Sequence, residues 1–283
     1  MTVTESAGLS IEELEGKARM ARADVIRLAD GSGEGHYGSA FSIVELLVGL
    51  FYHHLSLRSD EPDWPDRDRF TLGKGHGAVA LYPMLADLGY FERSRLDDFG
   101  HLGSSFGDHP NVHGVPGLDF SSGSIGHNLA VSVGMALALR RRGSSARVVN
   151  LLGDGEQTEG QIWEAAAHAS TFGLGNLVAI VDRNKVGADG TTAEVADLEP
   201  VADKWEAFGW EVLHLADGHD MTAVLDVLDR ALERGGDRPR VVLADTVVGR
   251  GVSFMEGHWQ WHQGFLGPAD RDRALAEIEN GLS

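Results

Sequence analysis

Residues 153–155, Gly153-Asp154-Gly155, together with Asn184, have the types and spacing of a metal-assisted diphosphate site. Asp154 follows the apolar run 148–152, and Asn184 follows a second apolar run, 176–182. Both runs are typical of buried parallel strands, which would bring the two side chains to one sheet edge. An Asp carboxylate, an Asn carbonyl and a backbone carbonyl suit Mg²⁺ that retains phosphate oxygens as ligands. Alone, either element would indicate only a tight turn or a loop residue. Together they favour the site.

Glycine clusters precede three predicted helices, 42–55, 78–89 and 128–142. Backbone amides at helix N-termini point outward and bind anions, which suits a diphosphate ligand. Further helices are expected at 11–29, with Ser10 as N-cap, at 161–171 and at 221–234, and further strands at 210–215 and 240–248. Alternating helices and unalternating apolar strands predict an α/β fold, a doubly wound and mostly parallel sheet with helices on both faces. We expect residues 11–283 to form a single domain and residues 1–10 to form a flexible tail.

Composition excludes several classes of function. The chain has 283 residues, a formal net charge of −19 and no cysteine. The negative charge argues against nucleic-acid binding and against docking on an anionic membrane. The absence of cysteine removes disulfides, thiolate catalysis and zinc–sulfur sites. Neither a signal segment nor a run of membrane-spanning length is present, so the cytoplasm is the expected location.

Several of the thirteen histidines lie among glycines instead of on apolar helix faces: His36, His76, His109, His127, His258 and His262. Core packing explains a glycine-flanked loop histidine poorly, although any one of them could be an ordinary surface residue. The pairs His109/His113 and His258/His262 have a spacing that helical zinc ligands use, but neither pair has a third ligand. We therefore do not expect zinc.

The segment 153–184 closely resembles the thiamine diphosphate motif of the transketolase family, and residues 156–165 resemble its transketolase version. The resemblance covers nearly the whole chain, from the first helix to about Leu266. It implies the thiamine diphosphate-binding fold, with thiamine diphosphate and Mg²⁺ as cofactors and Ca²⁺ or Mn²⁺ as possible substitutes. The activity it implies is transfer of a two-carbon ketol unit from a ketose to an aldose.

The same resemblance implies roles for individual residues. The catalytic group comprises His36, His76, His109 and His262, with His262 preferred over His258. The cofactor-binding group comprises His76, Gly123, Ile125, Gly153, Asp154, Gly155, Glu159, Asn184 and His262. The metal ligands are Asp154, Asn184 and the carbonyl of Val186. Glu159 would link two active sites through hydrogen bonds, although it could instead be an exposed acid in a first helical turn.

Two segments depart from the common family pattern. The family usually has Gly-Gln-Gly where this chain has Gly126-His127-Asn128, and Gly-His there is similar to the related deoxyxylulose phosphate synthases. The residues after His262 also differ. The first departure bears on the pocket wall and on substrate choice.

In this family a glutamate on a separate pyrimidine-binding domain activates the cofactor. Only about twenty residues follow His262, too few for such a domain. The chain thus resembles the first subunit of a split transketolase, and we expect a pyrimidine-binding partner subunit in a heterotetramer, acting on sugars or sugar phosphates. The alternatives are a related two-subunit enzyme with a 2-oxoacid or specialised-metabolite substrate, and a non-catalytic cofactor-binding scaffold.

Overall fold

A single five-stranded sheet forms the centre of the computed structural model, which describes residues 8–32 and 35–281. All neighbouring strands are parallel, in the order β1-β2-β3-β7-β6. Their bounds are β1 Arg69–Leu72, β2 Val148–Gly153, β3 Leu177–Arg183, β7 Arg240–Asp245 and β6 Glu211–Leu215. The three central strands are buried along nearly their whole length, as their unalternating apolar sequences predict.

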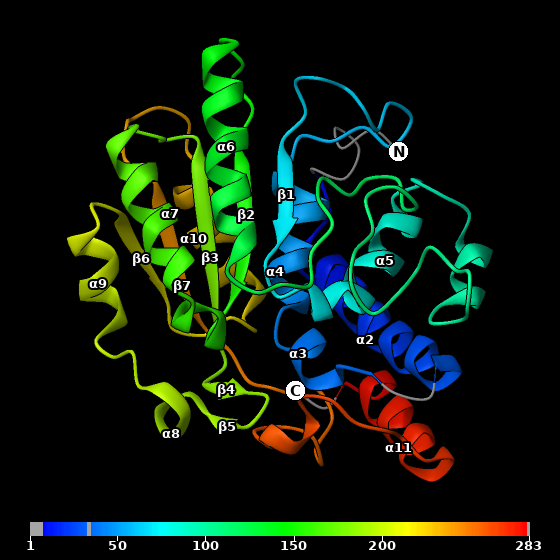
Figure 1. Ribbon diagram of the computed structural model, residues 1–283. Helices are drawn as coiled ribbons and strands as arrows, with labels where there is room; N and C mark the ends of the chain where they lie inside the picture. The colour runs from blue at the N-terminus through cyan, green and yellow to red at the C-terminus, as the bar shows by residue number, and fades with distance from the viewer. Residues whose placement is uncertain (1–7, 33–34, 282–283) are drawn as a thin grey trace.

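Helices cover both faces of this sheet, and a separate hydrophobic core lies on each face (Figure 1). One face carries α2 (Ile11–Ser32), α3 (Tyr37–Phe41), α4 (Val44–Gly49), α5 (Ala78–Asp87) and α10 (Met221–Ala231), with α11 (Pro268–Glu279) packed on α2. The other face carries α6 (His127–Arg141), α7 (Gly160–Thr171) and α9 (Val201–Ala207). The predicted doubly wound α/β fold is confirmed.

The N-terminus of α2 has the predicted cap. The backbone N–H of Glu13 donates to Ser10 Oγ at 3.3 Å, and that of Ser10 donates to Glu13 Oε2 at 2.7 Å. This reciprocal pair satisfies amides that a helix start leaves without partners. Of the predicted flexible tail, residues 1–7 lie outside the described residues.

The predicted helix 42–55 forms over residues 44–54, but only its first part is α-helical. Helix α3 ends at Phe41, α4 begins at Val44, and a π-helical turn follows at Leu50–His54. The break falls at Ser42 and Ile43, where the Ser42 hydroxyl donates to the buried Asp182 carboxylate at 2.7 Å. A buried carboxylate from β3 therefore lies at the junction of α3 and α4, and this junction was not predicted from the sequence.

Strand β7 is shorter than the predicted 240–248. It ends at Asp245 because the next two residues leave the ladder for side-chain partners: Thr246 Oγ1 donates to Asp182, and the Val247 amide donates to His219 Nε2 at 2.8 Å. The sequence pattern also missed β1, α9, α11, the hairpin of β4 (Val186–Gly187) and β5 (Gly190–Thr191), and α8 (Thr192–Ala196). Within the described ranges, no helix combines the length and apolar character needed to cross a bilayer.

Candidate functional site at the carboxyl edge of the sheet

The carboxyl ends of β2 and β3 lie side by side. The two strands pair in parallel with Gly153 opposite Asp182, so Asp154 and Asn184 each follow a neighbouring strand end. A 3-10 turn, Gly155–Thr158, leads from β2 into α7. A side chain added at Gly155 would meet no atom within 4 Å, so this glycine leaves open space at the strand end.

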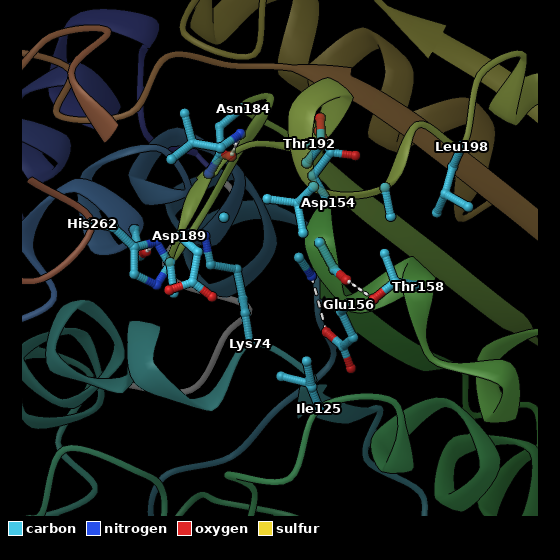
Figure 2. Close-up of a pocket in the computed structure, with 18 of the residues that line it drawn as sticks. Lys74, Ile125, Asp154, Glu156, Thr158, Asn184, Asp189, Thr192, Leu198 and His262 are labelled. Atoms are coloured by element: carbon cyan, nitrogen blue, oxygen red, sulfur yellow. Dashed lines mark hydrogen bonds between the residues drawn. The ribbon is translucent and has the colours of Figure 1, made fainter. Parts of the chain in front are cut away.

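A cavity of about 370 Å³ opens at this edge. In Figure 2, Asn184 lies above Asp154, Glu156 and Ile125 lie below it, and Lys74 and His262 lie to its left. The predicted site residues that line it are His76, Ile125, Gly153, Asp154, Gly155, Asn184, Val186 and His262. The remaining four, His36, His109, Gly123 and Glu159, do not line the cavity itself.

Each oxygen of the Asp154 carboxylate accepts a hydrogen bond from a different segment. Oδ1 accepts from Gln157 Nε2 at 3.2 Å, and Oδ2 accepts from the backbone N–H of Lys185 at 3.0 Å. Lys185 has φ of 61°, a left-handed conformation that turns this amide back toward the end of β2. Burial raises the pKa of Asp154 to about 6, although the Lys185 hydrogen bond opposes the rise.

The Asn184 amide is fixed at both ends. Its Oδ1 accepts from the Val186 N–H at 3.0 Å, and its Nδ2 donates to Asp182 Oδ2 at 2.9 Å. Because a carboxylate only accepts, the Nδ2 group must face Asp182, which leaves Oδ1 on the other side. Asp154 and Asn184 thus supply oxygen atoms that retain lone pairs beside one cavity, as a hard divalent cation requires.

Four predicted histidines form one cluster. The ring centre of His36 lies 5.0 Å from that of His76, 6.4 Å from His109 and 5.6 Å from His262, and the last lies 5.0 Å from His76. The cluster joins residues that are more than two hundred positions apart in the chain. Asp108 Oδ1 lies 3.0 Å from His36 Nδ1 and orients that ring.

Two of these imidazoles are held neutral. Burial, together with the positive charge of Lys74, lowers the pKa of His76 well below its ordinary value and that of His262 to about 4. A neutral imidazole presents one donor and one acceptor, so each ring can bind a hydroxyl group or relay a proton. Ser39 Oγ lies 3.0 Å from His262 Nδ1 and completes the orientation of that ring.

Two more predicted residues lie beside the cluster or at the molecular surface. Gly123 has φ of +147°, and a Cβ there would lie 3.4 Å from the His109 ring, so the loop passes close to that histidine. Glu159 is exposed at the start of α7. A Cβ added at Gly126 would lie 2.7 Å from the Glu159 Cβ, so the two residues are close neighbours. Exposure of Glu159 fits both a surface acid and a residue that another chain covers.

Glu156 was not singled out from the sequence, yet it is buried in the wall of the cavity. Its two carboxylate oxygens accept from the N–H groups of Gly126 at 2.9 Å and Gly153 at 3.0 Å. A Cβ on Gly73 would lie 2.6 Å from the same carboxylate. Burial raises the pKa of Glu156 to about 7. The residue therefore joins three glycine segments. Nothing near Glu156 in the sequence indicates that it is buried.

Lys74 was also missed as a site residue. It is 2% exposed, lines the cavity, and forms a buried ion pair with Asp182. The Asp182 carboxylate also accepts from Ser42, Thr246 and Asn184. A lysine between two glycines gave no sign of burial, because its partner follows more than a hundred residues later.

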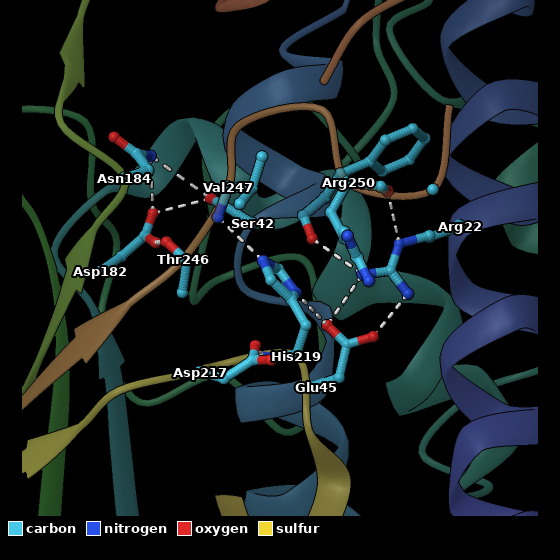
Figure 3. A network of polar contacts seen from close by, with 12 residues as sticks. Arg22, Ser42, Glu45, Asp182, Asn184, Asp217, His219, Thr246, Val247 and Arg250 are labelled. Carbon is cyan, nitrogen blue, oxygen red and sulfur yellow. Dashed lines mark hydrogen bonds and ion pairs between the residues drawn. The ribbon is translucent and has the colours of Figure 1, made fainter. Parts of the chain in front are cut away.

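A second set of charges, Arg22 and Glu45, is connected through His219 to the residues around Asp182 (Figure 3). Arg22 donates to both oxygens of Glu45, at 2.6 and 2.8 Å, and His219 Nδ1 lies 2.9 Å from Glu45 Oε2. The contacts continue toward the site, because the Val247 amide donates to His219 Nε2 and the adjacent Thr246 hydroxyl donates to Asp182. We call these residues the charged network: Arg22, Ser42, Glu45, Lys74, Asp182, His219, Thr246 and Val247.

The segment that departs from the common family pattern has one buried member. Asn128 is 1% exposed, and its Nδ2 donates to the Leu72 carbonyl at 2.9 Å, whereas His127 is exposed. Asn128 therefore ties α6 to the end of β1. Neither zinc-spaced histidine pair belongs to a larger ligand cluster: in the described parts of the chain, no group of three or more His, Cys, Asp or Glu residues is arranged to hold a metal ion.

Comparisons with known proteins agree on one family. Residues 16–278 match the family model described as transketolase, thiamine diphosphate binding domain. The chain is 38% identical over 273 residues to a subunit of the apulose-4-phosphate transketolase of Actinobacillus succinogenes, covering 96% of this chain and 98% of that protein. It is also 38% identical over 267 residues to the 6-deoxy-6-sulfo-D-fructose transketolase subunit SqwG of a Clostridium species, covering 94% and 96%.

Solved structures give the same result. A transketolase mutant from Pichia stipitis matches with a TM-score of 0.89 at 28% identity, over 95% of this chain and 41% of that one. Transketolase from Leishmania mexicana matches with a TM-score of 0.87 at 28% identity, over 96% and 41%. The chain therefore spans less than half the length of these solved transketolases and nearly the full length of the two subunits.

Proposed function

Because the chain belongs to the transketolase family, we propose that it is the diphosphate-binding subunit of a two-component transketolase. The complex would transfer a two-carbon ketol unit from a ketose donor to an aldose acceptor. Relatives of nearly the same length carry subunit names, which supports a split enzyme. The observation that carries the proposal is the cavity at the ends of β2 and β3, where Asp154 and Asn184 lie beside His76 and His262. Residues 11–283 would act as one domain.

Thiamine diphosphate and Mg²⁺ fit the groups at this edge, with Ca²⁺ or Mn²⁺ as substitutes for the metal. Each carboxylate oxygen of Asp154 has one hydrogen-bond donor and so keeps a lone pair. Asn184 Oδ1 and the Val186 carbonyl would complete a set of oxygen ligands, and phosphate oxygens would fill the rest. When bound, the cofactor supplies the carbon nucleophile of the transfer.

The protein's own residues would bind, orient and move protons. His76 and His262, both neutral at pH 7, would contact the diphosphate and substrate, while His36 and His109 would bind donor hydroxyls and transfer protons. The Gly123 carbonyl would accept from the aminopyrimidine. A group of further contacts would come from Ile125, packed on the cofactor, from Gly153 and Gly155 at the diphosphate, and from Glu159 between active sites.

The partner would be a pyrimidine-binding subunit that closes the cavity, in a heterotetramer of two chains of each kind. Apolar side chains at the cavity rim support this, since Ile125 is 38% exposed and Val195 is 59% exposed. The substrates would be sugars or sugar phosphates. The cytoplasmic location stays a prediction.

Two other functions predict different results. A related enzyme that uses a 2-oxoacid donor would release carbon dioxide from pyruvate when the two subunits are combined, whereas ketol transfer releases none. A non-catalytic scaffold would bind the cofactor without turnover. The intact histidine cluster, in which His76 and His262 have lowered pKa values, favours catalysis over a scaffold.

Asp154→Ala tests the metal assignment. Calorimetric titration of the full chain with premixed Mg²⁺ and thiamine diphosphate should show binding to the wild-type chain and a loss of about a hundredfold or more in the variant, because a metal ligand is gone. Asp189→Ala is the matched control, since Asp189 is another carboxylate that lines the cavity but is exposed on the β4–β5 turn. Equal affinity of Asp154→Ala and wild type would refute the assignment.

A further inference from the structure

The orientation of Asp154 depends on a neighbour three residues away. Gln157 lies in the turn after β2 and is 0% exposed. Its Nε2 group lies 3.2 Å from Asp154 Oδ1 and 3.3 Å from the Asp154 carbonyl oxygen, so it donates across the start of the turn. The opposite carboxylate oxygen is held by the Lys185 amide. Asp154 is thus held from both sides.

The Gln157 amide can face only one way. Its Oε1 accepts from the indole Nε1–H of Trp205 at 2.9 Å, and an indole nitrogen can only donate. The oxygen must therefore face Trp205, and the NH₂ group must face Asp154. Trp205 is itself fully buried, comes from α9, and belongs to the hydrophobic core on the α6, α7 and α9 face of the sheet.

Trp205 is rigid because other aromatic rings pack around it. Its ring centre lies 4.9 Å from that of Trp210 and 5.2 Å from that of Trp163. Trp163 donates its own indole N–H to the backbone carbonyl of Gln157 at 2.9 Å, and therefore holds the turn but not the side-chain amide. The two tryptophans give a natural comparison within one cluster.

We propose that Gln157, oriented by Trp205, is a positioning residue that holds the Asp154 carboxylate in its metal-binding orientation. We call Gln157 and Trp205 together the neutral brace. The proposal rests on the proposed function, because it assigns the brace a role in holding Mg²⁺ with thiamine diphosphate. Hydrogen bonds to a ligating carboxylate fix its rotamer before the metal binds. Metal binding then loses less side-chain conformational entropy.

The proposal predicts a loss of metal-dependent binding that a loss of stability alone does not produce. In Gln157→Leu the side chain keeps a similar volume but loses both polar contacts, and the affinity for premixed Mg²⁺ and thiamine diphosphate should fall about tenfold or more. Trp205→Phe keeps an aromatic ring but frees the Gln157 amide, and the affinity should fall about threefold to tenfold. Affinity for thiamine diphosphate with excess EDTA should stay the same in both variants.

Trp163→Phe is the matched control. It removes an indole hydrogen bond from the same cluster, which costs about 1 kcal/mol of stability for the bond itself, yet it should leave the Mg²⁺-dependent affinity within about twofold of wild type. Calorimetry of the full chain measures both affinities, and urea unfolding measures stability.

The outcomes separate this proposal from the one on which it rests. If wild type binds with Mg²⁺ and Gln157→Leu binds equally well while folded, the brace only completes the tryptophan contacts and the inference is wrong. If Trp163→Phe and Trp205→Phe weaken binding equally, general loosening of the cluster explains the effect, and the inference is again wrong. If wild type shows no Mg²⁺-dependent binding, the metal site itself is wrong.

Discussion

Two polar systems reach the carboxyl edge of the sheet from opposite faces, and they differ in charge. The charged network enters from the face of α2 and α4 and ends at Asp182, which holds the Asn184 amide. The neutral brace enters from the face of α7 and α9 and ends at Asp154. Each of the two side chains proposed as metal ligands, Asp154 and Asn184, thus has its own set of supporting hydrogen bonds.

The difference bears on what each system contributes. The charged network contains two buried ion pairs, Arg22 with Glu45 and Lys74 with Asp182, so loss of one partner leaves a buried charge without compensation. The neutral brace contains only dipoles, whose loss costs much less. We expect changes in the charged network to affect mainly stability and changes in the neutral brace to affect mainly metal binding.

The largest expected effect is on Glu45. Glu45→Gln leaves the Arg22 guanidinium, 6% exposed, without its counter-charge, and should lower the free energy of unfolding by about 3–5 kcal/mol. Glu61→Gln is the control, since Glu61 pairs with Arg58 at the surface and should cost less than about 1 kcal/mol. Urea unfolding measures both. Equal costs would mean that the buried pair has no special weight.

Acid should remove the same contribution without a mutation. Burial opposes ionisation of Glu45, but the Arg22 charge and the hydrogen bonds from His219 and Arg22 outweigh it and lower the pKa from its ordinary 4.5 to about 2. Because the folded pKa is depressed, the stabilisation is complete above about pH 4.5 and is lost as the pH falls toward about 2. The total is on the order of 3 kcal/mol.

Unfolding free energies between about pH 6 and about pH 3 test this, for wild type and Glu45→Gln. The gap between the two proteins should narrow as the pH falls. A gap that stays constant would contradict the lowered pKa of Glu45.

His219 comes next in size. Its Nε2 accepts from the Val247 amide and its Nδ1 donates to Glu45, which fixes the neutral tautomer. His219→Ala leaves that amide unsatisfied and should cost about 2 kcal/mol of unfolding free energy. His168→Ala, which removes a contact on the exposed side of α7, should cost less than about 0.5 kcal/mol. Equal costs in thermal unfolding would show that His219 is not integral to the charged network.

These networks also mark the limit of prediction from the sequence. Four of the five parallel strands and most of the helices on both faces follow from local apolar patterns, since unalternating runs such as 148–152 and 176–182 indicate buried strands. The break at Ser42 and the early end of β7 at Asp245 do not, because both depend on contacts with Asp182 and His219 that are distant in sequence.

The candidate site divides in the same way. The residues proposed as ligands could be selected because Gly153-Asp154-Gly155 and Asn184 carry a recognisable spacing, and the four histidines because glycines flank them. The sequence did not single out the buried polar residues Glu156, Gln157 and Lys74. Nothing local indicates that a polar residue in a turn is buried, because its hydrogen-bond partners come together only in the folded protein.

The smallest expected effect concerns Ser42, where the charged network comes closest to Asn184. Its hydroxyl donates to Asp182 Oδ2 at 2.7 Å and lies 3.4 Å from Asn184 Nδ2. In Ser42→Ala the Asp182 carboxylate keeps its partners Lys74 and Thr246, and Nδ2 keeps its shorter bond to Asp182 at 2.9 Å. The free energy of unfolding of Ser42→Ala should therefore be about 1 kcal/mol lower than that of wild type.

The affinity of Ser42→Ala for Mg²⁺ with thiamine diphosphate should change by less than about threefold, which is well under 1 kcal/mol. The Asn184 amide stays oriented because Asp182 can only accept from Nδ2 and the Val186 amide still donates to Oδ1. Gln157→Leu, measured in the same calorimeter, is the reference for a true loss of ligand orientation. If Ser42→Ala weakened binding as much as Gln157→Leu, a neutral hydroxyl would be positioning Asn184. The division between a stabilising charged network and a metal-positioning neutral brace would then fail.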